Sequence, residues 1–217
     1  MDDKSEISLI FSILSKTHQP TMLEQLGQLT FTPFQLLVAT LLSARSKDST
    51  VIPIVKEMFG KYPNPKDFID IDIKILEKMI FKIGFYRVKA RNIQKLSKIL
   101  LEQFQGVVPD TLEGMTSLPG VGRKTANCML NQVFHKPAIA VDIHVHRISN
   151  RLGWVKTKSP EETEIALQKI VPYDEWIKVN SLLVDHGQRI CNPINPRCGI
   201  CSIRRHCVFG KKENKFN

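Results

Sequence analysis

The sequence has no long apolar run, comparatively few acidic residues and few cysteines. No stretch of the 217 residues approaches the roughly 18 to 20 apolar residues of a membrane span, which argues against an integral membrane protein. The N-terminus, MDDKSEISLI, opens with acidic residues and lacks the basic-then-apolar order of a signal peptide. We therefore expect a cytoplasmic protein that does not bind membranes.

Acidic residues are outnumbered, since 21 Asp and Glu accompany 31 Lys and Arg and give a formal charge of +10 at pH 7. Such a surplus attracts polyanions, so nucleic acid is the first partner to consider, although basic proteins without that function are common. Basic residues are dense from Lys78 to Lys98, a stretch without any acid. We expect phosphate contacts along this stretch.

The sequence also lacks strand-like alternation, internal repeats and low-complexity tracts. Apolar residues instead recur at helical spacing, and proline or glycine residues such as Pro53 and Gly84 separate the helical stretches. The pattern predicts an all-α fold of many short helices. The stretches are Ile7–Leu14, Phe34–Leu42, Ile52–Phe59, Leu76–Ile83, Ile93–Phe104, Ala126–Phe134, Ile143–Leu152, Ile165–Val171 and Trp176–Val184.

The segment Leu118–Ala126, LPGVGRKTA, has the pattern of a helix–hairpin–helix motif, which we expect over about 112–133. Its two glycines allow a tight turn with outward-facing N–H groups, and the next helix adds unpaired N–H groups and a positive dipole end. This combination predicts a site for one DNA phosphate, read without regard to base sequence. The residues expected to hold it are Gly120, Val121, Gly122 and Arg123.

Lys124 is a candidate nucleophile in the first turn of that second helix. A free lysine, with a pKa of about 10.4, is almost wholly protonated at neutral pH. The helix N-terminus and the neighbouring Arg123 disfavour the charged form, and burial would lower the pKa further. A neutral Lys124 could attack C1′ of a deoxyribose and form a Schiff base. On the hairpin alone, however, simple phosphate contact is the more economical role.

Asp142 follows at the expected start of another helix. As an N-cap it would contribute about 1 kcal/mol to stability. A capping carboxylate keeps one oxygen available, so Asp142 could also activate Lys124 or water and stabilise a cationic sugar. His144 and His146 are interpreted as packing or DNA-facing groups rather than metal ligands, because residues two apart on a helix do not share a face.

Four of the five cysteines crowd into the last 30 residues, with the spacing C-x6-C-x2-C-x5-C. Four thiolates fit either a [4Fe–4S] cluster or structural zinc. Zinc sites more often use two C-x2-C pairs, and only one is present, which favours iron–sulfur. The candidate ligands are Cys191, Cys198, Cys201 and Cys207, whereas Cys128 lies in an apolar helical stretch and is expected in the core.

The sequence resembles the endonuclease III family of DNA glycosylases, because the hairpin, the lysine, the aspartate and the cysteine box occur in the same order. The resemblance extends from about Pro33 to Cys207. Further matching residues are Leu41-Leu42-Ser43-Ala44 with Asp48, Ile83-Gly84-Phe85-Tyr86 with Lys89, and His186-Gly187. The resemblance implies two helical domains with a DNA-binding cleft between them. A six-helix domain would span 26–136, and an iron–sulfur domain would join 1–25 to 137–217.

The resemblance also implies a bifunctional DNA glycosylase/AP lyase of base excision repair, acting as a nucleoid-associated monomer. Its partner would be double-stranded DNA carrying an oxidised or ring-saturated pyrimidine, which is flipped out of the stack, or an abasic site. Lys124 would form the Schiff base with Asp142 as its carboxylate partner, and β-elimination would cleave 3′ to the abasic site. The four cysteines of the box would bind a [4Fe–4S] cluster.

At three positions near the implied site, this sequence has a residue other than the one that is usual in the family. Arg45 stands where the family often has a glutamine that fills the gap left by the flipped base; arginine can pair with guanine, which suggests a preference for lesions opposite guanine. Phe85 stands at an apolar wedge, often leucine, that would intercalate. Ile143 replaces the usual threonine after the aspartate, which affects the hydrogen bonding around Asp142.

The alternative to an enzyme is a non-catalytic helix–hairpin–helix module that grips DNA phosphate and holds a structural metal. Such a module gives Lys124 and Asp142 no reason to occur together. Among related glycosylases, a thymine-mismatch branch has tyrosine in place of the lysine, and an adenine-removing branch carries an additional C-terminal domain. The presence of Lys124 therefore favours the bifunctional enzyme.

Overall fold

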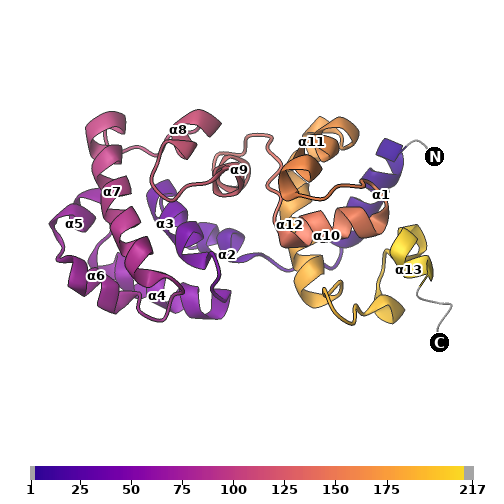
Figure 1. Ribbon diagram of the computed structural model, residues 1–217, viewed down its shortest axis with the longest axis horizontal. Helices are drawn as coiled ribbons and strands as arrows, with labels where there is room; N and C mark the ends of the chain where they lie inside the picture. Colours follow the sequence, from indigo (N-terminus) through magenta and orange to yellow (C-terminus); the bar gives the residue numbers. More distant parts are fainter. Residues whose placement is uncertain (1–2, 213–217) are drawn as a thin grey trace. The chain divides into compact units, whose positions relative to one another are not determined.

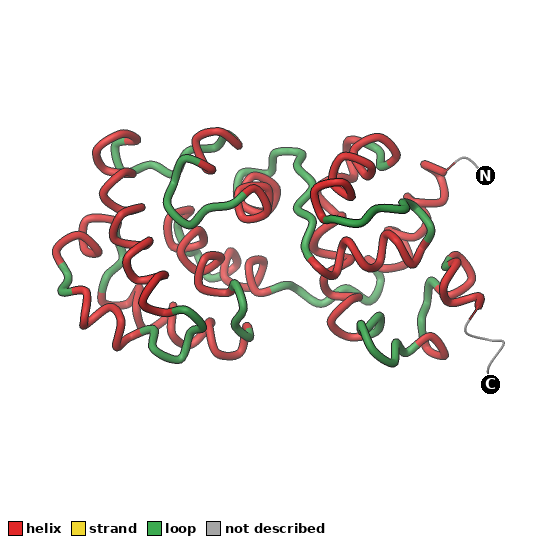
Figure 2. The backbone as a smooth tube through the Cα atoms, in the orientation of Figure 1, coloured by secondary structure: helices red, strands yellow, loops and turns green. Residues whose placement is uncertain are grey.

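The computed structural model describes residues 3–212, which form helices and loops with no strand among them (Figures 1 and 2). The predicted all-α class is confirmed. The chain divides into two compact units. We call Met22–Phe134 the hairpin unit, and the residues up to Thr21 together with those from His135 onward the cysteine unit. Within the described range, every helix is too short or too polar to cross a membrane.

The hairpin unit comprises helices α2 to α9, rather than the six helices that the resemblance implied. The difference arises because short segments of five to seven residues, such as α5 and α8, count as separate helices. The bounds are α2 (Met22–Gln28), α3 (Pro33–Ser43), α4 (Asp48–Lys61), α5 (Pro65–Asp70), α6 (Ile73–Met79), α7 (Tyr86–Phe104), α8 (Leu112–Thr116) and α9 (Arg123–Gln132).

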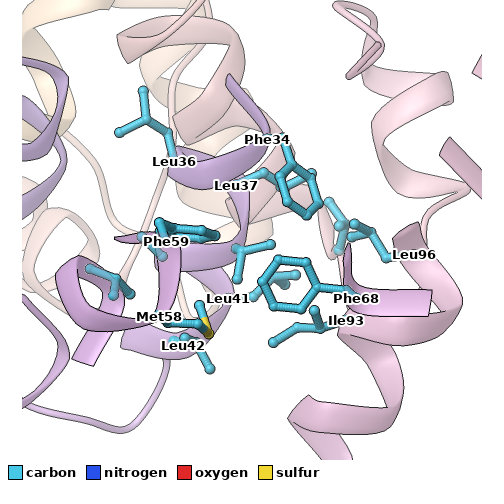
Figure 3. Close-up of a cluster of buried hydrophobic side chains, with 14 of the residues drawn as sticks. Phe34, Leu36, Leu37, Leu41, Leu42, Met58, Phe59, Phe68, Ile93 and Leu96 are labelled. Carbon is cyan, nitrogen blue, oxygen red and sulfur yellow. The ribbon is translucent and has the colours of Figure 1, made fainter. Parts of the chain in front are cut away.

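Helix α3 forms the centre of the hairpin unit, because it is largely apolar and is buried on all sides. Every residue from Phe34 to Leu42 is buried, as expected for a helix that is surrounded by others. Rings from α4 and α5 meet it edge-on: Phe34 lies 6.3 Å from Phe59 and 5.6 Å from Phe68 between ring centroids (Figure 3). This core packs α4 against α3 and so positions the loop between them, where the candidate site residue Arg45 lies.

Pro53 does not separate two helices, as its residue type led us to expect, but lies inside α4. Proline lacks an N–H group and so cannot donate to the carbonyl of Ser49 one turn earlier. The helix continues through it because Val51 and Val55 are fully buried on the face that packs on the core. Burial of that face outweighs the loss of one backbone hydrogen bond.

Two other helix boundaries differ from the apolar pattern. The expected helix over Leu76–Ile83 ends at Met79, and Ile80 and Ile83 are buried in the loop that follows. Apolar spacing alone cannot separate a buried loop from a buried helix turn. In contrast, α7 begins at Tyr86, before the expected start at Ile93. The apolar pattern missed these first turns because they are largely exposed and carry basic residues.

The cysteine unit is built around α10 and α12. Gly187 allows their close approach, because a Cβ atom at this position would lie 2.7 Å from His144 Nδ1 and 3.0 Å from Ile148 Cδ1. Ser159 caps α11 and Pro160 occupies its first turn. The helices are α1 (Asp3–Ser15), α10 (Ile143–Leu152), α11 (Pro160–Ile170), α12 (Trp176–Arg189) and α13 (Val208–Lys212), with 3₁₀ turns at Tyr173–Glu175, Cys198–Ile200 and Arg204–His206.

Candidate functional site

The hairpin connects α8 to α9 through a turn anchored by the buried side chains of Leu118 and Val121. Gly120 has φ +83°, and a Cβ atom there would lie 2.7 Å from Asn92 Nδ2, so this position needs glycine for both conformation and space. Gly122 has ordinary extended φ and is the N-cap of α9 without a side-chain cap. The N–H groups in the first turn of a helix have no acceptor within the helix, and a helix start of this kind suits a phosphate oxygen.

Lys124 is the second residue of α9, and its side chain is exposed rather than buried. The burial that the sequence analysis considered for Lys124 is therefore not found. Asp48, the first residue of α4, is close enough to interact with it electrostatically: burial raises the pKa of the Asp48 carboxyl, while the Lys124 ammonium acts in the opposite direction. The fold thus brings a carboxyl group from α4 toward the candidate nucleophile, a proximity that the local sequence around Lys124 does not reveal.

Arg45 and Phe85 come from different loops of the hairpin unit and meet at the surface. The guanidinium carbon of Arg45 lies 5.2 Å from the centroid of the Phe85 ring. Both side chains are exposed. They line one wall of a cavity that the hairpin residues Gly120 and Thr125 also line. Two residues that the sequence assigned to DNA contact on separate grounds therefore face the same space as the hairpin.

Asp142 is the N-cap of α10, as predicted. Its Oδ1 atom accepts hydrogen bonds from the backbone N–H groups of His144 and Val145, over 2.8 and 2.9 Å. These bonds fix the orientation of the carboxylate. Ile143 beside it is 70% exposed, so the apolar side chain that replaces the family's threonine faces outward.

The two histidines of this segment have other partners. The Nδ1 atom of His144 lies 3.1 Å from an Arg147 nitrogen, and that of His146 lies 2.7 Å from the Thr163 hydroxyl. Both imidazole rings thus contact polar side chains of α10 or α11.

Two arginines on one face of α10 hold the loop that carries the first cysteine. Arg147 donates to the carbonyl of Cys191 over 2.8 Å, and Arg151 donates to Cys191 Sγ over 3.2 Å and to the carbonyl of Asn192 over 2.7 Å. Residues four apart lie on one helix face, so the sequence shows that Arg147 and Arg151 share a face. It does not show that this face contacts the cysteine loop. Helix α10 therefore connects the candidate carboxylate at its start to the cysteine loop along its side.

The four cysteines of the box line one cavity of the cysteine unit. Burial, followed by the neighbouring thiols, raises the pKa of Cys201 to about 11. Two donors face the sulfurs: the Gly210 N–H donates to Cys207 Sγ over 3.3 Å, and Arg151 donates to Cys191 Sγ over 3.2 Å. His186 Nε2 lies 3.6 Å from Cys201 Sγ. Such a setting, with thiols spread around a cavity and hydrogen-bond donors directed at sulfur, fits an anionic thiolate cluster.

Cys128 lies apart from this group, on α9 in the hairpin unit, where it is buried. Its expected place in the core is therefore correct. Lys89 is a residue whose role the sequence did not reveal. Its Nζ donates to the backbone carbonyls of Leu42 and Ala44 at the end of α3, directly before Arg45.

Comparison with known proteins gives consistent matches over most of the chain. A model of the HhH-GPD superfamily of base excision DNA repair proteins matches residues 38–173. Endonuclease III of Thermotoga maritima is 48% identical over 183 residues, covering 84% of this chain and 86% of that protein. Endonuclease III of Bacillus subtilis is 42% identical over 184 residues, covering 84% of each.

Solved structures agree with these matches. The structure of a trapped covalent intermediate of endonuclease III with DNA matches with a TM-score of 0.84 at 37% identity, covering 97% of this chain and 98% of that chain. The range matched by the superfamily model contains the hairpin, Lys124 and Asp142.

Proposed function

The chain belongs to the endonuclease III family within the HhH-GPD superfamily, and on that premise we propose how its residues carry out the reaction. The resemblance found in the sequence is confirmed. The protein is a bifunctional DNA glycosylase/AP lyase of base excision repair. The alternative of a non-catalytic DNA-binding module is set aside, because the relatives match nearly the full length of the chain and include a trapped covalent enzyme–DNA intermediate.

Lys124 is the nucleophile. Its neutral Nζ attacks C1′ of the damaged nucleotide, and the glycosidic bond breaks. Asp142 takes up the proton that the amine gives up and passes it to the base, which leaves with the bonding electrons. Opening of the sugar then leaves a Schiff base between C1′ and Nζ. Loss of a proton from C2′ expels the 3′ phosphate by β-elimination, and water finally hydrolyses the Schiff base. The exposure of Lys124 at the start of α9 supports this role, because an external C1′ atom can reach it.

Asp142 is the carboxylate partner. It accepts a proton as the nucleophile attacks, and its negative charge stabilises the cationic sugar that forms as the base departs. The two backbone hydrogen bonds to Oδ1 support this assignment, because they hold the carboxylate in one orientation before the substrate arrives. Preorganised charge of this kind needs no rearrangement during the reaction.

The hairpin binds one phosphate of the DNA backbone through Gly120, Val121, Gly122 and Arg123, without reading the bases. Oxidised or ring-saturated pyrimidines are the substrate class, together with abasic sites. The damaged nucleotide is rotated out of the stack, which costs a few kcal/mol and costs least where pairing is already weakened. Phe85, exposed at the surface, enters the stack as the wedge.

The four cysteines hold a [4Fe–4S] cluster rather than zinc. The four thiols line one cavity, and their spacing contains one C-x2-C pair, whereas zinc sites more often use two. When bound, the cluster would link the chain segments that carry its cysteine ligands. This chain's own contribution is the pair of arginines on α10, which carry positive charge to the cysteine loop.

We assign the protein to the cytoplasm, associated with the nucleoid, as a monomer. The DNA substrate supports this location. Sedimentation with and without a short duplex tests the oligomeric state, and a monomer that binds one duplex is expected. A dimer that binds a single lesion would contradict the assignment.

The convergence of an exposed lysine, a hairpin N-terminus and a neighbouring cavity in one unit carries the proposal. The test is a single-turnover assay on a duplex with one 5,6-dihydrouracil, with released base and cut strand measured separately. One protein should give both products, and the cut strand should end in an unsaturated aldehyde. Base release without a cut would show a monofunctional glycosylase, and binding without either product would restore the binding-module alternative.

A further inference from the structure

Helix α7 carries a line of basic side chains on its outer face. Residues that are three or four positions apart lie on the same side of a helix, and the members of this line follow that spacing. All of them are exposed, whereas the opposite side of α7, which includes Ile93 and Leu100, is fully buried in the core. We call this line the α7 stripe, and it consists of Arg87, Arg91, Lys95 and Lys98.

The stripe lacks the acidic neighbours that would neutralise its charge. No Asp or Glu occurs between Lys78 and Lys98, and like charges four residues apart on a helix repel each other. Within the part of the chain that the structure describes, Lys98 is the one member that forms a salt bridge, with Glu102 at 3.7 Å. Helix α4, in contrast, pairs its exposed Lys61 with Glu57 at 2.9 Å. A line of unneutralised like charges suits a partner that carries many negative charges.

The stripe differs in this respect from the other lysine of the same helix. Lys89 Nζ donates to the carbonyl of Leu42, over 2.9 Å, and to that of Ala44. The charge of Lys89 is therefore engaged within the protein, on a side of α7 that packs against α3. The charges of the stripe face solvent, where an external ligand can reach them.

Helix α7 also contacts the hairpin that is the proposed phosphate site. Asn92, which follows Arg91, comes so close to the turn that a Cβ atom at Gly120 would lie 2.7 Å from Asn92 Nδ2. Val88 and Asn92 line the same cavity as Thr125, the residue directly after the proposed nucleophile. The stripe therefore extends the surface on which the proposed function places DNA, and this continuity favours DNA over an acidic protein as its occupant.

The length of the stripe matches a stretch of DNA backbone. From Arg87 to Lys98 the helix rises by roughly 16 Å, and one strand of duplex DNA carries about five phosphates over such a distance. A row of long cationic side chains fits a row of phosphates better than a single compact anion. Lysine and arginine bind backbone phosphates without regard to the base sequence.

We propose that the α7 stripe is a second DNA-contact surface, which binds backbone phosphates of the duplex that flanks the lesion. The inference rests on the proposed function, since the hairpin and Lys124 place the DNA beside α7. Contacts to phosphate do not depend on the bases, so the stripe contributes equally to the binding of damaged and undamaged duplex. It holds the enzyme on undamaged DNA while the enzyme searches, and it adds nothing to the recognition of the lesion.

The test measures dissociation constants of the cluster-containing full-length protein as the salt concentration rises. Two duplexes of equal length are used, one undamaged and one with a central tetrahydrofuran abasic analogue, which cannot react. Each phosphate contact contributes about 0.9 to the slope of log K against log salt. Arg91→Gln/Lys95→Gln should therefore lower the slope by about 1.8, and from about 50 to about 200 mM salt it should lose roughly tenfold less affinity than wild type. The ratio of the two dissociation constants should stay at its wild-type value.

A matched control removes the same charge from the same unit. Lys56 of α4 and Lys66 of α5 are exposed, and an acidic residue directly follows each of them. Lys56→Gln/Lys66→Gln should keep the wild-type slope. Because glutamine forms helices about as well as arginine and lysine, the urea midpoints of all variants should match that of wild type. Arg87→Gln/Lys98→Gln provides a second stripe pair, and it should lower the slope as the first pair does.

The outcomes separate this inference from the function on which it rests. An unchanged slope in both stripe pairs would overturn the DNA assignment and leave a solvated face or a surface for an acidic protein. An equal fall in the control pair would also overturn it, because net charge rather than contact would then determine binding. Borohydride trapping of the same proteins on a true abasic site reports the function separately. An adduct together with an unchanged slope defeats only the inference, and a lowered slope without any adduct from wild type defeats the proposed chemistry.

Discussion

Arg151 donates a hydrogen bond to Cys191 Sγ over 3.2 Å, and it does so from the helix whose first turn is capped by Asp142. The same guanidinium group lies 4.5 Å from the ring centroid of Phe209 and donates to two backbone carbonyls of the cysteine loop. A single side chain therefore connects α10 to three parts of the cysteine cavity. We therefore expect the position of α10 and the integrity of the proposed cluster site to depend on the same contacts.

Replacement of Arg151 tests that dependence. Arg151→Met keeps much of the apolar volume but removes the hydrogen bond to sulfur. Hydrogen bonds to charged groups contribute roughly 1.5 to 3 kcal/mol, so loss of visible cluster absorbance in air should accelerate by about tenfold or more. Arg197→Met is the control, because Arg197 lines the same cavity and its loss also removes one positive charge. Equal bleaching rates in the two variants would show that charge, rather than the hydrogen bond, protects the cluster.

Two substitutions separate the capping role of Asp142 from the catalytic role that we propose for it. Asn caps helices about as well as Asp, so Asp142→Asn should unfold at the wild-type temperature while base release slows by about 10²- to 10⁴-fold. Asp142→Ala should also lose about 1 kcal/mol of stability. Ser159→Ala, which removes the cap of α11, should show a similar loss of stability with normal activity. Full activity in Asp142→Asn would exclude the carboxylate from the reaction.

The cysteines predict a clear difference in metal content. Cys201→Ser should lose iron, visible colour and thermal stability together, because Cys201 lines the cavity with the other three cysteines of the box. Cys128→Ala should keep all the iron, since Cys128 is a buried residue of α9. Elemental analysis of both purified variants provides the measurement. Zinc rather than iron in the wild-type protein would contradict the cluster assignment.

Lys89 predicts a particular dependence of stability on pH. Burial lowers its pKa from 10.5 to about 8. Between these values the unfolded chain holds a proton that the folded chain has released, so the free energy of unfolding contributed by this group rises with pH. Wild type should therefore gain stability relative to Lys89→Met as pH increases from about 8 to about 10.5. Urea midpoints measured across this window test it, with Lys95→Met, an exposed lysine of the same helix, as the control. A difference that stays constant or falls with pH would be incompatible with a lowered pKa.

Much of the site could be predicted because its signals are local. The cap at Asp142, the turn at Gly120 and the spacing of the cysteines each depend on residues close together in the sequence, and local geometry determines what such residues can do. The all-α class follows from the same kind of short-range information, since apolar spacing reports which faces are buried.

The remaining features depend on contacts between distant segments. The stacking of Arg45 on Phe85 and the hydrogen bonds from Lys89 to the end of α3 form only when the packing of α3 against α7 brings two loops together. No periodicity reports such a contact. The interaction of Asp48 with Lys124 was missed for the same reason, and the exposure of Lys124 could not be obtained from an apolar pattern around it.

The central claim is that Lys124 forms a covalent Schiff base with DNA, and borohydride trapping tests it most directly. The protein is incubated with borohydride and a duplex that contains thymine glycol or an abasic site, alongside Lys124→Ala and the control Lys56→Ala. Wild type and the control should give a stable protein–DNA adduct, and Lys124→Ala should give none while it still binds DNA and retains its cluster. An adduct of undiminished yield with Lys124→Ala, or no adduct from a wild-type protein that binds the damaged duplex, would contradict the account.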